Sequence, residues 1–497
     1  MRIDQVRLQG VLATAALHRA LSGVKGDDPP AGRCLGGRGI TILVQRLQEA
    51  LLARGYLTSR VVAPEQNLKS GVLVLRIVEG RIARVRAAPP GEALPRLAWT
   101  LHGGDIFNLH DLEQSSENLL RLPSLQSRIR IEPGEATDTS DIVASMNPQR
   151  PVRLGLALDN DGLRSTGRLQ GNLSATWDNP LGLADFCYVS MGQSLGAKGR
   201  GPRGNASRIV HYSLPWGYWM LGATLSDNRN HQTVFGPYES YRYAGKSSQV
   251  ELSLQRVVHR NGRSKTTASA RTFLRRANNY IGDLEVMVQR RRTAGWELGV
   301  QHLHHLSAGT LNVQLAYRRG TAAFGAEPAP EEATGQGSGR MRLVTGWLNW
   351  AMPMHCGRHL WQYSSQWQAQ WSTMRLTPQD RFCLGGRATV RGFDGEQTLC
   401  GDRGQLWRQE LSTALPTRLA PDGGIQAYAA LDTGRATRVG HDDTLRLTGM
   451  SVGLRGQYLV ADAYPLQWEA FVGHPVSKPE GFITARFTAG FNIRVTF

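Results

Sequence analysis

The sequence has no apolar run long enough for a membrane-spanning helix. Its longest runs, such as residues 72–75 and 11–17, fall far short of the roughly 20 residues that a helix needs to cross a bilayer. The first ten residues, MRIDQVRLQG, lack the basic, apolar and small-residue segments of a secretory signal. The sequence as it stands therefore predicts neither a transmembrane helix nor an export signal.

Cysteine, aromatic residues and acids are also scarce. The five cysteines include no CxxC pair, which argues against a thiolate metal cluster and against a dense disulfide scaffold. Acidic residues number 40 against 58 lysines and arginines, and the net charge of +18 suits an anionic partner such as nucleic acid, lipid or an acidic polypeptide. Glycine is plentiful, at 56 of 497 residues, which is typical of a protein with many turns.

Residues 1 to about 148 have a mixed α/β pattern. Leu43, Leu47 and Leu51 form an apolar stripe that predicts a helix over 40–52, ended by Gly55. Short β-rich runs accompany it at residues 3–8, 58–62 and 71–78. A second unit repeats the plan, with predicted strands at 81–86 and 127–132 and predicted helices at 94–101 and 109–122. We therefore expect two small α+β domains in tandem.

From about residue 151 the pattern changes to alternating strands of roughly 9 to 12 residues. Leu154, Leu156 and Leu158, for example, alternate with small or polar residues, and the chain ends in the alternating sequence FNIRVTF at 491–497. Such strands have one apolar and one polar face. They fit a soluble sandwich, or a closed barrel with lipid outside and a polar lumen.

The turns favour the barrel because they alternate in length. Short turns are predicted at residues 178–180, 215–217 and 261–263, and long loops at 196–207, 226–245 and 321–340. Short turns at one end and long loops at the other are typical of outer-membrane barrels. A sheet that spans a bilayer must close on itself, so a chain that ends in a full-length strand also fits.

One stretch, RATVRGFDGEQ at residues 387–397, is too rich in glycine for a strand and too β-branched for a helix. It is either an ordinary loop or a polar plug inside a pore. Cys383 and Cys400 bracket it, and a disulfide between them is possible in an oxidising compartment. The alternative for this pair is two isolated thiols.

Several segments resemble one family over nearly the whole sequence. They include GYLTSR at 55–60, VEGRI at 78–82, FNLHDLEQ at 107–114, residues 382–397 and LDTG at 431–434. These segments resemble the outer-membrane transporters of two-partner secretion, of the haemolysin and filamentous-haemagglutinin type. The family carries POTRA domains, which are small periplasmic α+β modules.

The resemblance implies a mixed fold. Two POTRA domains, at residues 1–80 and 81–148, would precede an antiparallel transmembrane β-barrel of about sixteen strands at residues 149–497. A lumenal loop would span about 375–403. The implied function is export of an unfolded partner exoprotein, such as a haemolysin, an adhesin or a contact-dependent toxin, across the outer membrane without ATP. The protein would be a monomer in contact with outer-membrane lipid.

The resemblance also implies site residues. In this family a Val-Arg-Gly-[Phe/Tyr] motif tips a loop folded into the barrel, and its arginine pairs with an aspartate on the wall; the matching residues are Val390, Arg391, Gly392, Phe393 and Asp432. A guanidinium fork matches a carboxylate well in a confined, partly dry lumen. Partner binding by the POTRA domains would involve Gly55, Tyr56, Thr58, Phe107, Leu109 and Leu112.

The sequence departs from the family in two places. The family begins with a signal peptide and usually a helix that plugs the pore, whereas this sequence starts at what resembles the first strand of the first POTRA domain, so both are expected to be missing. The Arg-Asn-Glu-Leu pattern expected after the loop is RQEL at 408–411.

Motifs that resemble catalytic or cofactor sites do not have the right surroundings. GQSLG at 192–196 has the letters of an esterase elbow without a following helix, and GKS at 245–247 lacks the first glycine of a phosphate loop. The histidines at 302, 304, 305, 355 and 359 have no acidic or cysteine partner at metal-ligand spacing. We therefore expect no enzyme activity, no cofactor and no metal.

Arginine pairs and triplets lie near the expected strand ends, at residues 275–276, 290–292 and 318–319. They favour anionic lipid headgroups and a hydrated pore over nucleic acid, which would need a continuous basic face interleaved with aromatics. Two alternatives to secretion remain: a related barrel that assembles other membrane proteins, and a soluble basic adhesin or nucleic-acid-binding protein.

Overall fold

The computed structural model describes the chain except for residues 24, 197–201, 358, 416–423, 442 and 462. The loop expected at 196–207 therefore lies partly outside the described residues, and its last part was wrong, because residues 203–207 belong to the strand β12 (Arg203–Trp216). The chain divides into two compact units, of which the first comprises Met1–Pro151 with the turns Asp178–Asp185 and Pro215–Tyr218. The second comprises Val152–Trp177, Phe186–Leu214 and Trp219–Phe497.

The first α+β domain is a three-stranded sheet covered by a helix. Its strand order is β2-β5-β4, with β2 parallel to β5 and β4 antiparallel to it. The leucine stripe of α2, Leu43, Leu47 and Leu51, is buried in one core with Leu73 and Leu75 of β5, as the sequence predicts. The elements are β1 (Arg2–Ile3), β2 (Gln5–Gln9), α1 (Ala15–Ala20), β3 (Arg33–Cys34), α2 (Gly37–Leu52), β4 (Arg60–Val62), η1 (Leu68–Ser70) and β5 (Val72–Val78).

The second α+β domain has a sheet in the order β6-β8-β7. Its elements are β6 (Arg81–Ala87), η2 (Arg96–Ala98), α3 (Leu109–Leu120), β7 (Arg128–Pro133) and β8 (Thr139–Ser145). The prediction of a helix at 94–101 was wrong, because only the single turn η2 forms there. Pro95 keeps the preceding residue out of the helical region, and Trp99 is extended, so too few residues remain for a helix.

The central strand β8 carries a buried carboxylate between two arginines. Asp141 Oδ2 accepts hydrogen bonds from Arg84 Nε at 2.8 Å and from Arg86 Nε at 3.2 Å, both on the neighbouring strand β6. The hydrogen bond from Arg84 is the main cause that lowers the pKa of Asp141 below its usual value. The carboxylate is therefore favoured in the folded domain.

The contacts of Asp141 with Arg84 and Arg86 are expected to make the stability of the second domain sensitive to acid. Because the pKa of Asp141 is lower in the folded than in the unfolded chain, its stabilisation is complete above the unfolded value of about 3.9 and is lost as the pH falls through the folded value. We expect hydrogen-exchange protection of β6 and β8, corrected for intrinsic rates, to fall on acidification in the wild type. In Asp141→Asn, protection should be lower at neutral pH and change less; an equal acid response in both would contradict this assignment.

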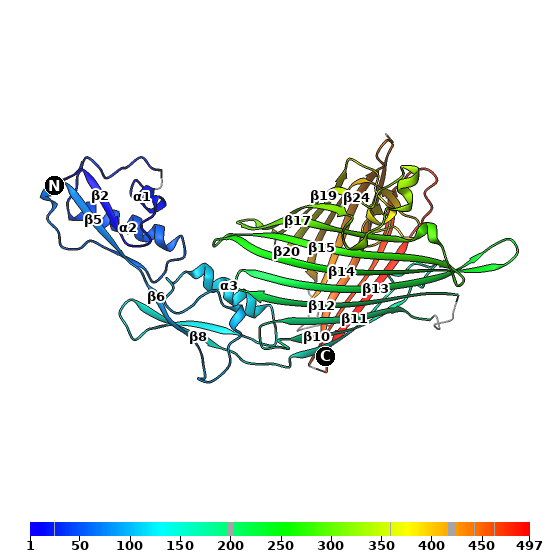
Figure 1. Cartoon of the computed structure of the whole chain (residues 1–497), viewed down its shortest axis with the longest axis horizontal. Helices are drawn as coiled ribbons and strands as arrows, with labels where there is room; N and C mark the ends of the chain where they lie inside the picture. Colours follow the sequence, from blue (N-terminus) through cyan, green and yellow to red (C-terminus); the bar gives the residue numbers. More distant parts are fainter. Residues whose placement is uncertain (24, 197–201, 358, 416–423, 442, 462) are drawn as a thin grey trace. The chain divides into compact units, whose positions relative to one another are not determined.

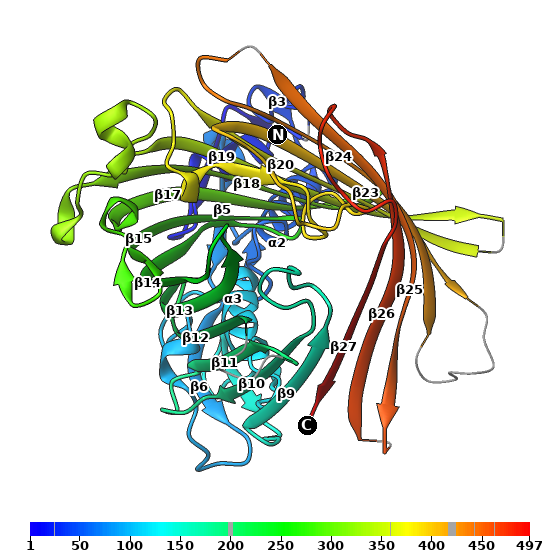
Figure 2. The ribbon, with the colours of Figure 1, turned by 90° about the vertical axis from the view of Figure 1, so that its right-hand side faces the viewer.

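The second unit is a closed barrel of sixteen antiparallel strands in the described part of the chain, with the two-residue β16 as an extra hairpin arm. β27 pairs with β9, for example Ile493 with Leu158, and this pairing closes the sheet (Figure 2). The strands are β9 (Val152–Asp159), β10 (Gln170–Asp178), β11 (Phe186–Ser194), β12 (Arg203–Trp216), β13 (Trp219–Phe235), β14 (Ser240–Arg260), β15 (Ser264–Ile281), β16 (Leu284–Glu285), β17 (Arg291–Leu306), β18 (Gly309–Thr321), β19 (Arg342–Cys356), β20 (His359–Ser372), β23 (Arg403–Leu415), β24 (Ile425–Thr437), β25 (Thr444–Val460), β26 (Tyr464–Ser477) and β27 (Thr488–Thr496). The fold class predicted from the sequence is confirmed.

The outer surface of the barrel is apolar. Leu154 and Leu156 of β9, and Val250, Leu252 and Leu254 of β14, are exposed, and their alternating neighbours face the interior. Exposed aliphatic side chains at every second position of successive strands make a surface suited to lipid acyl chains. No helix in the described part of the chain is long and apolar enough to span a bilayer.

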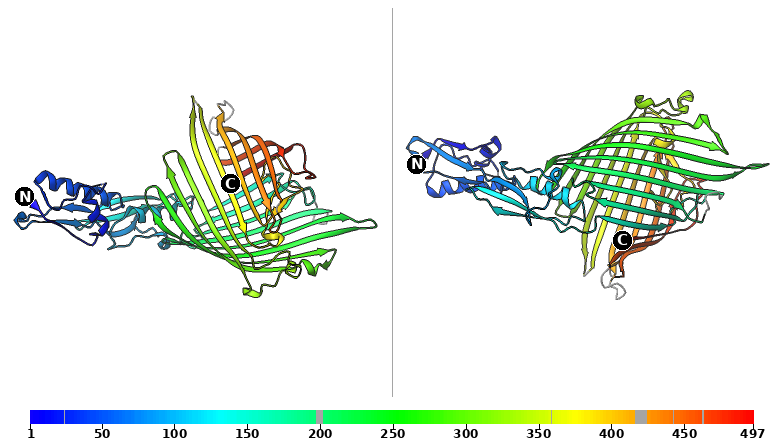
Figure 3. Two further views of the ribbon diagram at one scale, coloured as in Figure 1. Left: turned by 90° about the horizontal axis from the view of Figure 1, so that it is seen from above. Right: turned by 60° about the horizontal axis from the view of Figure 1, so that its bottom comes forward.

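Two expectations about the barrel were wrong in detail. Strands exceed the expected length, up to 21 residues in β14, and the loop expected at 226–245 is mostly strand, with only residues 236–239 as a turn. The long β13–β14 hairpin is visible in Figures 1 and 3. Its polar residues suggested a loop, but backbone pairing continues beyond the apolar part of each strand. The loop expected at 321–340 is present between β18 and β19.

Candidate functional site: a loop held inside the barrel

The connection between β20 and β23, residues 373–402, folds back inside the barrel. It contains the turn η6 (Pro378–Asp380) and a small hairpin of β21 (Phe382–Leu384) and β22 (Leu399–Gly401). The wall residues that contact it alternate with outward-facing residues: Asp432 is fully buried while its neighbour Leu431 is 46% exposed. The loop contacts therefore come from the lumenal face of the wall.

Arg391 joins this loop to the barrel wall. Its Nε and Nη2 donate to the two carboxylate oxygens of Asp432 on β24, each at 2.8 Å, and its backbone N–H donates to Asp432 Oδ2 at 2.9 Å. Its Nη1 donates to Glu410 Oε2 on β23 at 2.5 Å. Arg391 is 8% exposed. A bidentate, largely dry contact of this kind is stronger than an exposed ion pair.

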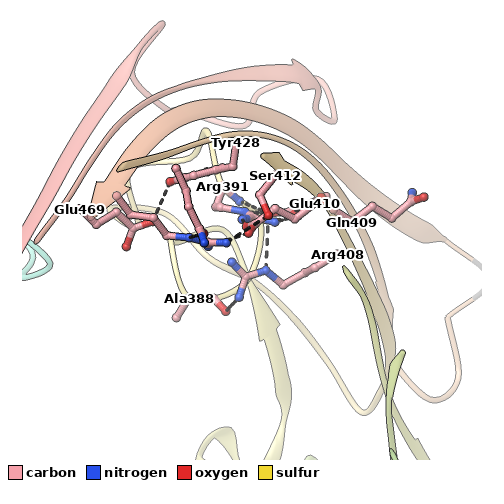
Figure 4. A network of polar contacts seen from close by, with 11 residues as sticks. Ala388, Arg391, Arg408, Gln409, Glu410, Ser412, Tyr428 and Glu469 are labelled. Carbon is pink, nitrogen blue, oxygen red and sulfur yellow. Dashed lines mark hydrogen bonds and ion pairs between the residues drawn. The ribbon is translucent and has the colours of Figure 1, made fainter. Parts of the chain in front are cut away.

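Further charged residues surround this contact, as Figure 4 shows. Arg455 of β25 donates to Glu410 Oε1 at 2.7 Å, so Glu410 lies between two guanidinium groups. Arg408 lies 3.6 Å from Asp432 and donates to the Ala388 carbonyl of the loop. The Tyr428 hydroxyl donates to Glu469 at 2.7 Å. The carboxylates of the wall are thus compensated by both wall and loop arginines.

The residues next to Arg391 fit closely against the wall. Gly392 has φ of 107°, and a Cβ there would lie 2.5 Å from the His474 carbonyl oxygen of β26. Val390 and Phe393 are fully buried in an apolar cluster that includes Leu384, Leu406 and Leu447. Phe393 meets Phe482 edge-on, with ring centroids 5.8 Å apart. Only glycine fits this approach, and the apolar cluster adds burial to the ionic contact.

A second group of contacts anchors the loop at other points of the barrel. Arg387 pairs with Asp161, with Nε and Oδ1 2.6 Å apart, and donates to Asn160 beyond the end of β9. Asp394 accepts from the Thr484 hydroxyl at 3.2 Å and from the Ala485 N–H at 3.0 Å, both between β26 and β27. The loop is therefore attached through several independent polar contacts.

Cys383 and Cys400 lie opposite each other on β21 and β22 and are joined by a disulfide. The bond closes residues 383–400 into a covalent ring that carries Arg391 at its far end. The ring limits the number of conformations open to residues 383–400 whether or not Arg391 contacts the wall. Cys34, Cys187 and Cys356 are free thiols.

The candidate partner-binding residues of the α+β domains lie around one junction. The Gly55 carbonyl accepts from the Leu109 N–H at 2.8 Å, and the Phe107 N–H donates to the Gly80 carbonyl at 2.9 Å. Phe107 and Gly55 are buried, so their side of the junction is structural. Tyr56, Thr58, Leu109 and Leu112 are each partly exposed.

Sequence reasoning missed several contributors to the loop site. Glu410 stood in the RQEL segment, and its alternation with the outward residues Trp407 and Leu411 could have placed it in the lumen. Arg455 follows the outward-facing Leu454, so strand alternation could likewise have placed Arg455 in the lumen. Asp394 gave no signal, because its partners are in a connection distant in sequence. In the described part of the chain no three His, Cys, Asp or Glu residues gather as metal ligands.

A lipid-facing antiparallel barrel, a lumenal loop fixed by buried ion pairs and two preceding α+β domains define a class of protein: an outer-membrane barrel with periplasmic POTRA domains. Profiles of two POTRA domains, one of them of ShlB type, match residues 1–80 and 81–133. The profile of the haemolysin secretion/activation proteins ShlB/FhaC/HecB matches residues 138–456. The chain belongs to this family of two-partner secretion transporters.

The similarity to individual relatives extends over most of the chain. It is 34% identical over 479 residues to the outer membrane transporter CdiB-2 of Burkholderia pseudomallei, covering 94% of this chain and 79% of that protein. It is 28% identical to the hemolysin transporter protein HpmB of Proteus mirabilis, covering 92% and 79%. The structure of CdiB from Escherichia coli superposes with a TM-score of 0.89 at 28% identity, covering 100% of this chain and 90% of that one.

Family membership settles the broad function and the location. The protein is an outer-membrane transporter of two-partner secretion, and its POTRA domains are periplasmic. The alternatives of a barrel assembly factor and of a soluble basic protein are not supported. The prediction of a secretion transporter is confirmed.

Proposed function

We propose that the protein captures one unfolded partner exoprotein in the periplasm and exports it through a lumen that the loop carrying Arg391 closes at rest. The observation that carries this proposal is the buried contact of Arg391 with Asp432 and Glu410, which ties the loop to the inner wall. Release of this contact would free the lumen for an extended chain. The partner would be a haemolysin, an adhesin or a contact-dependent toxin.

Capture would use the POTRA domains. A partner segment can add to an open sheet edge, at β2 or β4 of the first domain or at β7 of the second, where main-chain hydrogen bonds give affinity with little sequence demand. The start of β6 is already paired with residues 104–106. Tyr56, Leu109 and Leu112 would then supply apolar contacts beside the added segment. Folding of the partner outside the cell would prevent its return, so no nucleotide is required.

The experiment that tests this proposal is reconstitution of the purified chain in lipid vesicles without nucleotide. A candidate partner with its export signal is added unfolded on the POTRA side, and the fraction that becomes protected from protease is measured. If the transporter acts as a monomer, the protease-protected fraction of the partner rises in proportion to the number of barrels. A partner that lacks its signal domain is the control. Transport that requires ATP, or that ignores the signal domain, would contradict the proposal.

A charge exchange tests the latch itself. The double variant Arg391→Asp/Asp432→Arg keeps an ion pair between positions 391 and 432 with the charges exchanged. It also places a carboxylate at position 391 beside Glu410, which contacts Arg391 at 2.5 Å in the wild type. We therefore expect the double exchange to seal the pore poorly, and the additional change Glu410→Gln to improve sealing. Ion conductance in planar bilayers is the measurement, and equal sealing with and without Glu410→Gln would show that Glu410 takes no part.

A further inference from the structure

Six cations occupy outward-facing positions on six adjacent strands of the barrel wall. The direction of each follows from strand alternation with exposed apolar residues, such as Val250 on β14, Leu298 on β17, Leu315 on β18 and Val344 on β19. The six, which we name the basic belt, are Arg229 (β13), Lys246 (β14), Arg276 (β15), Arg292 (β17), Arg319 (β18) and Arg342 (β19).

The belt residues oppose one another directly across the strands. Arg229 pairs in register with Lys246, Arg276 with Arg292, and Arg319 with Arg342. Like charges directly opposite each other destabilise an antiparallel sheet. Only Arg229 has a carboxylate partner, Asp227 at 3.0 Å, in the described part of the chain. Among the described residues the other belt cations therefore have no carboxylate partner; Arg292 Nη2 donates to the Phe324 carbonyl at 3.0 Å, and Lys246 lies over the Tyr280 ring.

Cations that face the lumen behave differently. Arg275 lies beside Arg276 but points inward, where it pairs with Asp380 at 3.1 Å. Arg318 lies beside Arg319 and points inward to Glu297, at 2.7 Å. The sequence thus supplies carboxylates to the inner cations and withholds them from the outer ones on the same strands. This contrast indicates that the counter-charge of the belt comes from outside the protein.

The height of the belt on the strands identifies that environment. Because the periplasmic domains lead into the start of β9, the ends of the strands near 235, 281, 321 and 342 lie on the extracellular side. Each belt residue lies one to two outward positions beyond an apolar or aromatic side chain, such as Leu274, Tyr317 or Val344. Two residues advance roughly 7 Å along a strand, so the belt lies just outside the hydrocarbon layer.

We propose that the basic belt binds the phosphate groups of the lipid A type of lipid in the outer leaflet. Arginine forks match phosphate oxygens bidentately, and the opposed pairs Arg276–Arg292 and Arg319–Arg342 each present two cations to one anionic group. This deepens the general expectation of lipid contact, rests on the outer-membrane location, and is independent of the proposed export step.

The test is native mass spectrometry of the purified full chain in detergent, titrated with diphosphorylated lipid A. The variant Arg276→Gln/Arg319→Gln/Arg342→Gln should bind about a hundredfold more weakly, since each basic residue at such a surface contributes on the order of fivefold. The corresponding triple lysine variant keeps the charge but loses the bidentate fork, so its affinity should lie between those of the wild type and the glutamine variant. Retained heat-modifiable migration establishes that each variant is still a closed barrel.

A matched control removes three charges at the opposite end of the strands: Arg256→Gln/Arg260→Gln/Arg263→Gln. It should bind diphosphorylated lipid A as the wild type does, and dephosphorylated lipid A should bind weakly to all variants. Equal binding by the glutamine triple variant, or equal binding of dephosphorylated lipid, would overturn the proposal, as would full competition by inorganic phosphate. Partner secretion measured in parallel separates loss of lipid binding from failure of export.

Discussion

Arg391→Ala is expected to unseat the lumenal loop and open the resting pore. The substitution leaves Asp432 fully buried without its bidentate partner and removes one of the two cations of Glu410. Removing one partner of a buried ion pair destabilises the state that contains it by on the order of 3 kcal/mol or more. Here this lowers the ratio of closed to open loops by about a hundredfold. Purified protein in planar bilayers should show a large rise in the open fraction over the wild type.

The variant Arg391→Lys separates charge from geometry. An ammonium keeps the charge but cannot engage both oxygens of Asp432 and Glu410 together, so its open fraction should lie between those of the wild type and Arg391→Ala. Arg435 on the same wall strand is exposed and donates to Gln405 at 3.1 Å, away from the loop contact, and Arg435→Ala should leave conductance unchanged. A closed pore in Arg391→Ala would mean that the other anchors suffice without this contact.

Gly392→Ala is expected to open the pore without any change of charge. Gly392 has φ of 107°, and a Cβ there would lie 2.5 Å from the His474 carbonyl oxygen. Because this oxygen belongs to the backbone, either the loop or β26 would have to shift. Strain of this kind costs about 1–3 kcal/mol for the backbone conformation alone, before the clash is counted. The loop should therefore leave its seat, and the open fraction in planar bilayers should approach that of Arg391→Ala.

The same loop offers a matched control in Gly386. Its φ is not in the left-handed region, and a Cβ there would meet nothing closer than 3.6 Å. Gly386→Ala should therefore conduct like the wild type. If Gly386→Ala and Gly392→Ala had equal effects, general stiffening of the loop would explain both, and the close approach to β26 would not.

The sequence predicts the fold because the physical rules of a membrane barrel are strict. Alternation at every second residue identifies lipid-facing positions such as Leu154 and Val250, and closure requires the final strand. Strand ends were harder, since the polar residues of 226–245 suggested a loop although their backbone continues the ladder. Leu94 to Leu101 had the composition of a helix, but Pro95 limits that segment to one turn.

The site was predictable only in part. The resemblance supplied Arg391 and Asp432, and the structure brings them into contact. Glu410 and Arg455 complete the charge balance, and only the register of β23, β24 and β25 shows that they meet. The anchors of Asp394 depend on the connection between β26 and β27, which lies 90 residues away in the chain. Local patterns carry no information about such contacts.

The central claim is that the loop must leave its seat for export. It is tested most directly by a reversible lock between the loop and the β26–β27 connection, Asp394→Cys with Thr484→Cys. The Asp394 Oδ1 and Thr484 Oγ1 atoms are 3.2 Å apart, and peptide mass spectrometry after oxidation measures the fraction of barrels in which the two cysteines have bonded. The wild type, with its own disulfide Cys383–Cys400, receives the same oxidant and reductant as a control.

Export of the co-expressed partner to the cell surface is then measured before and after reduction. The account predicts that the oxidised lock stops export and that reduction restores it, while the wild type exports under both conditions. Undiminished export through fully oxidised, cross-linked barrels would contradict the account, because the partner would then pass with the loop still in place.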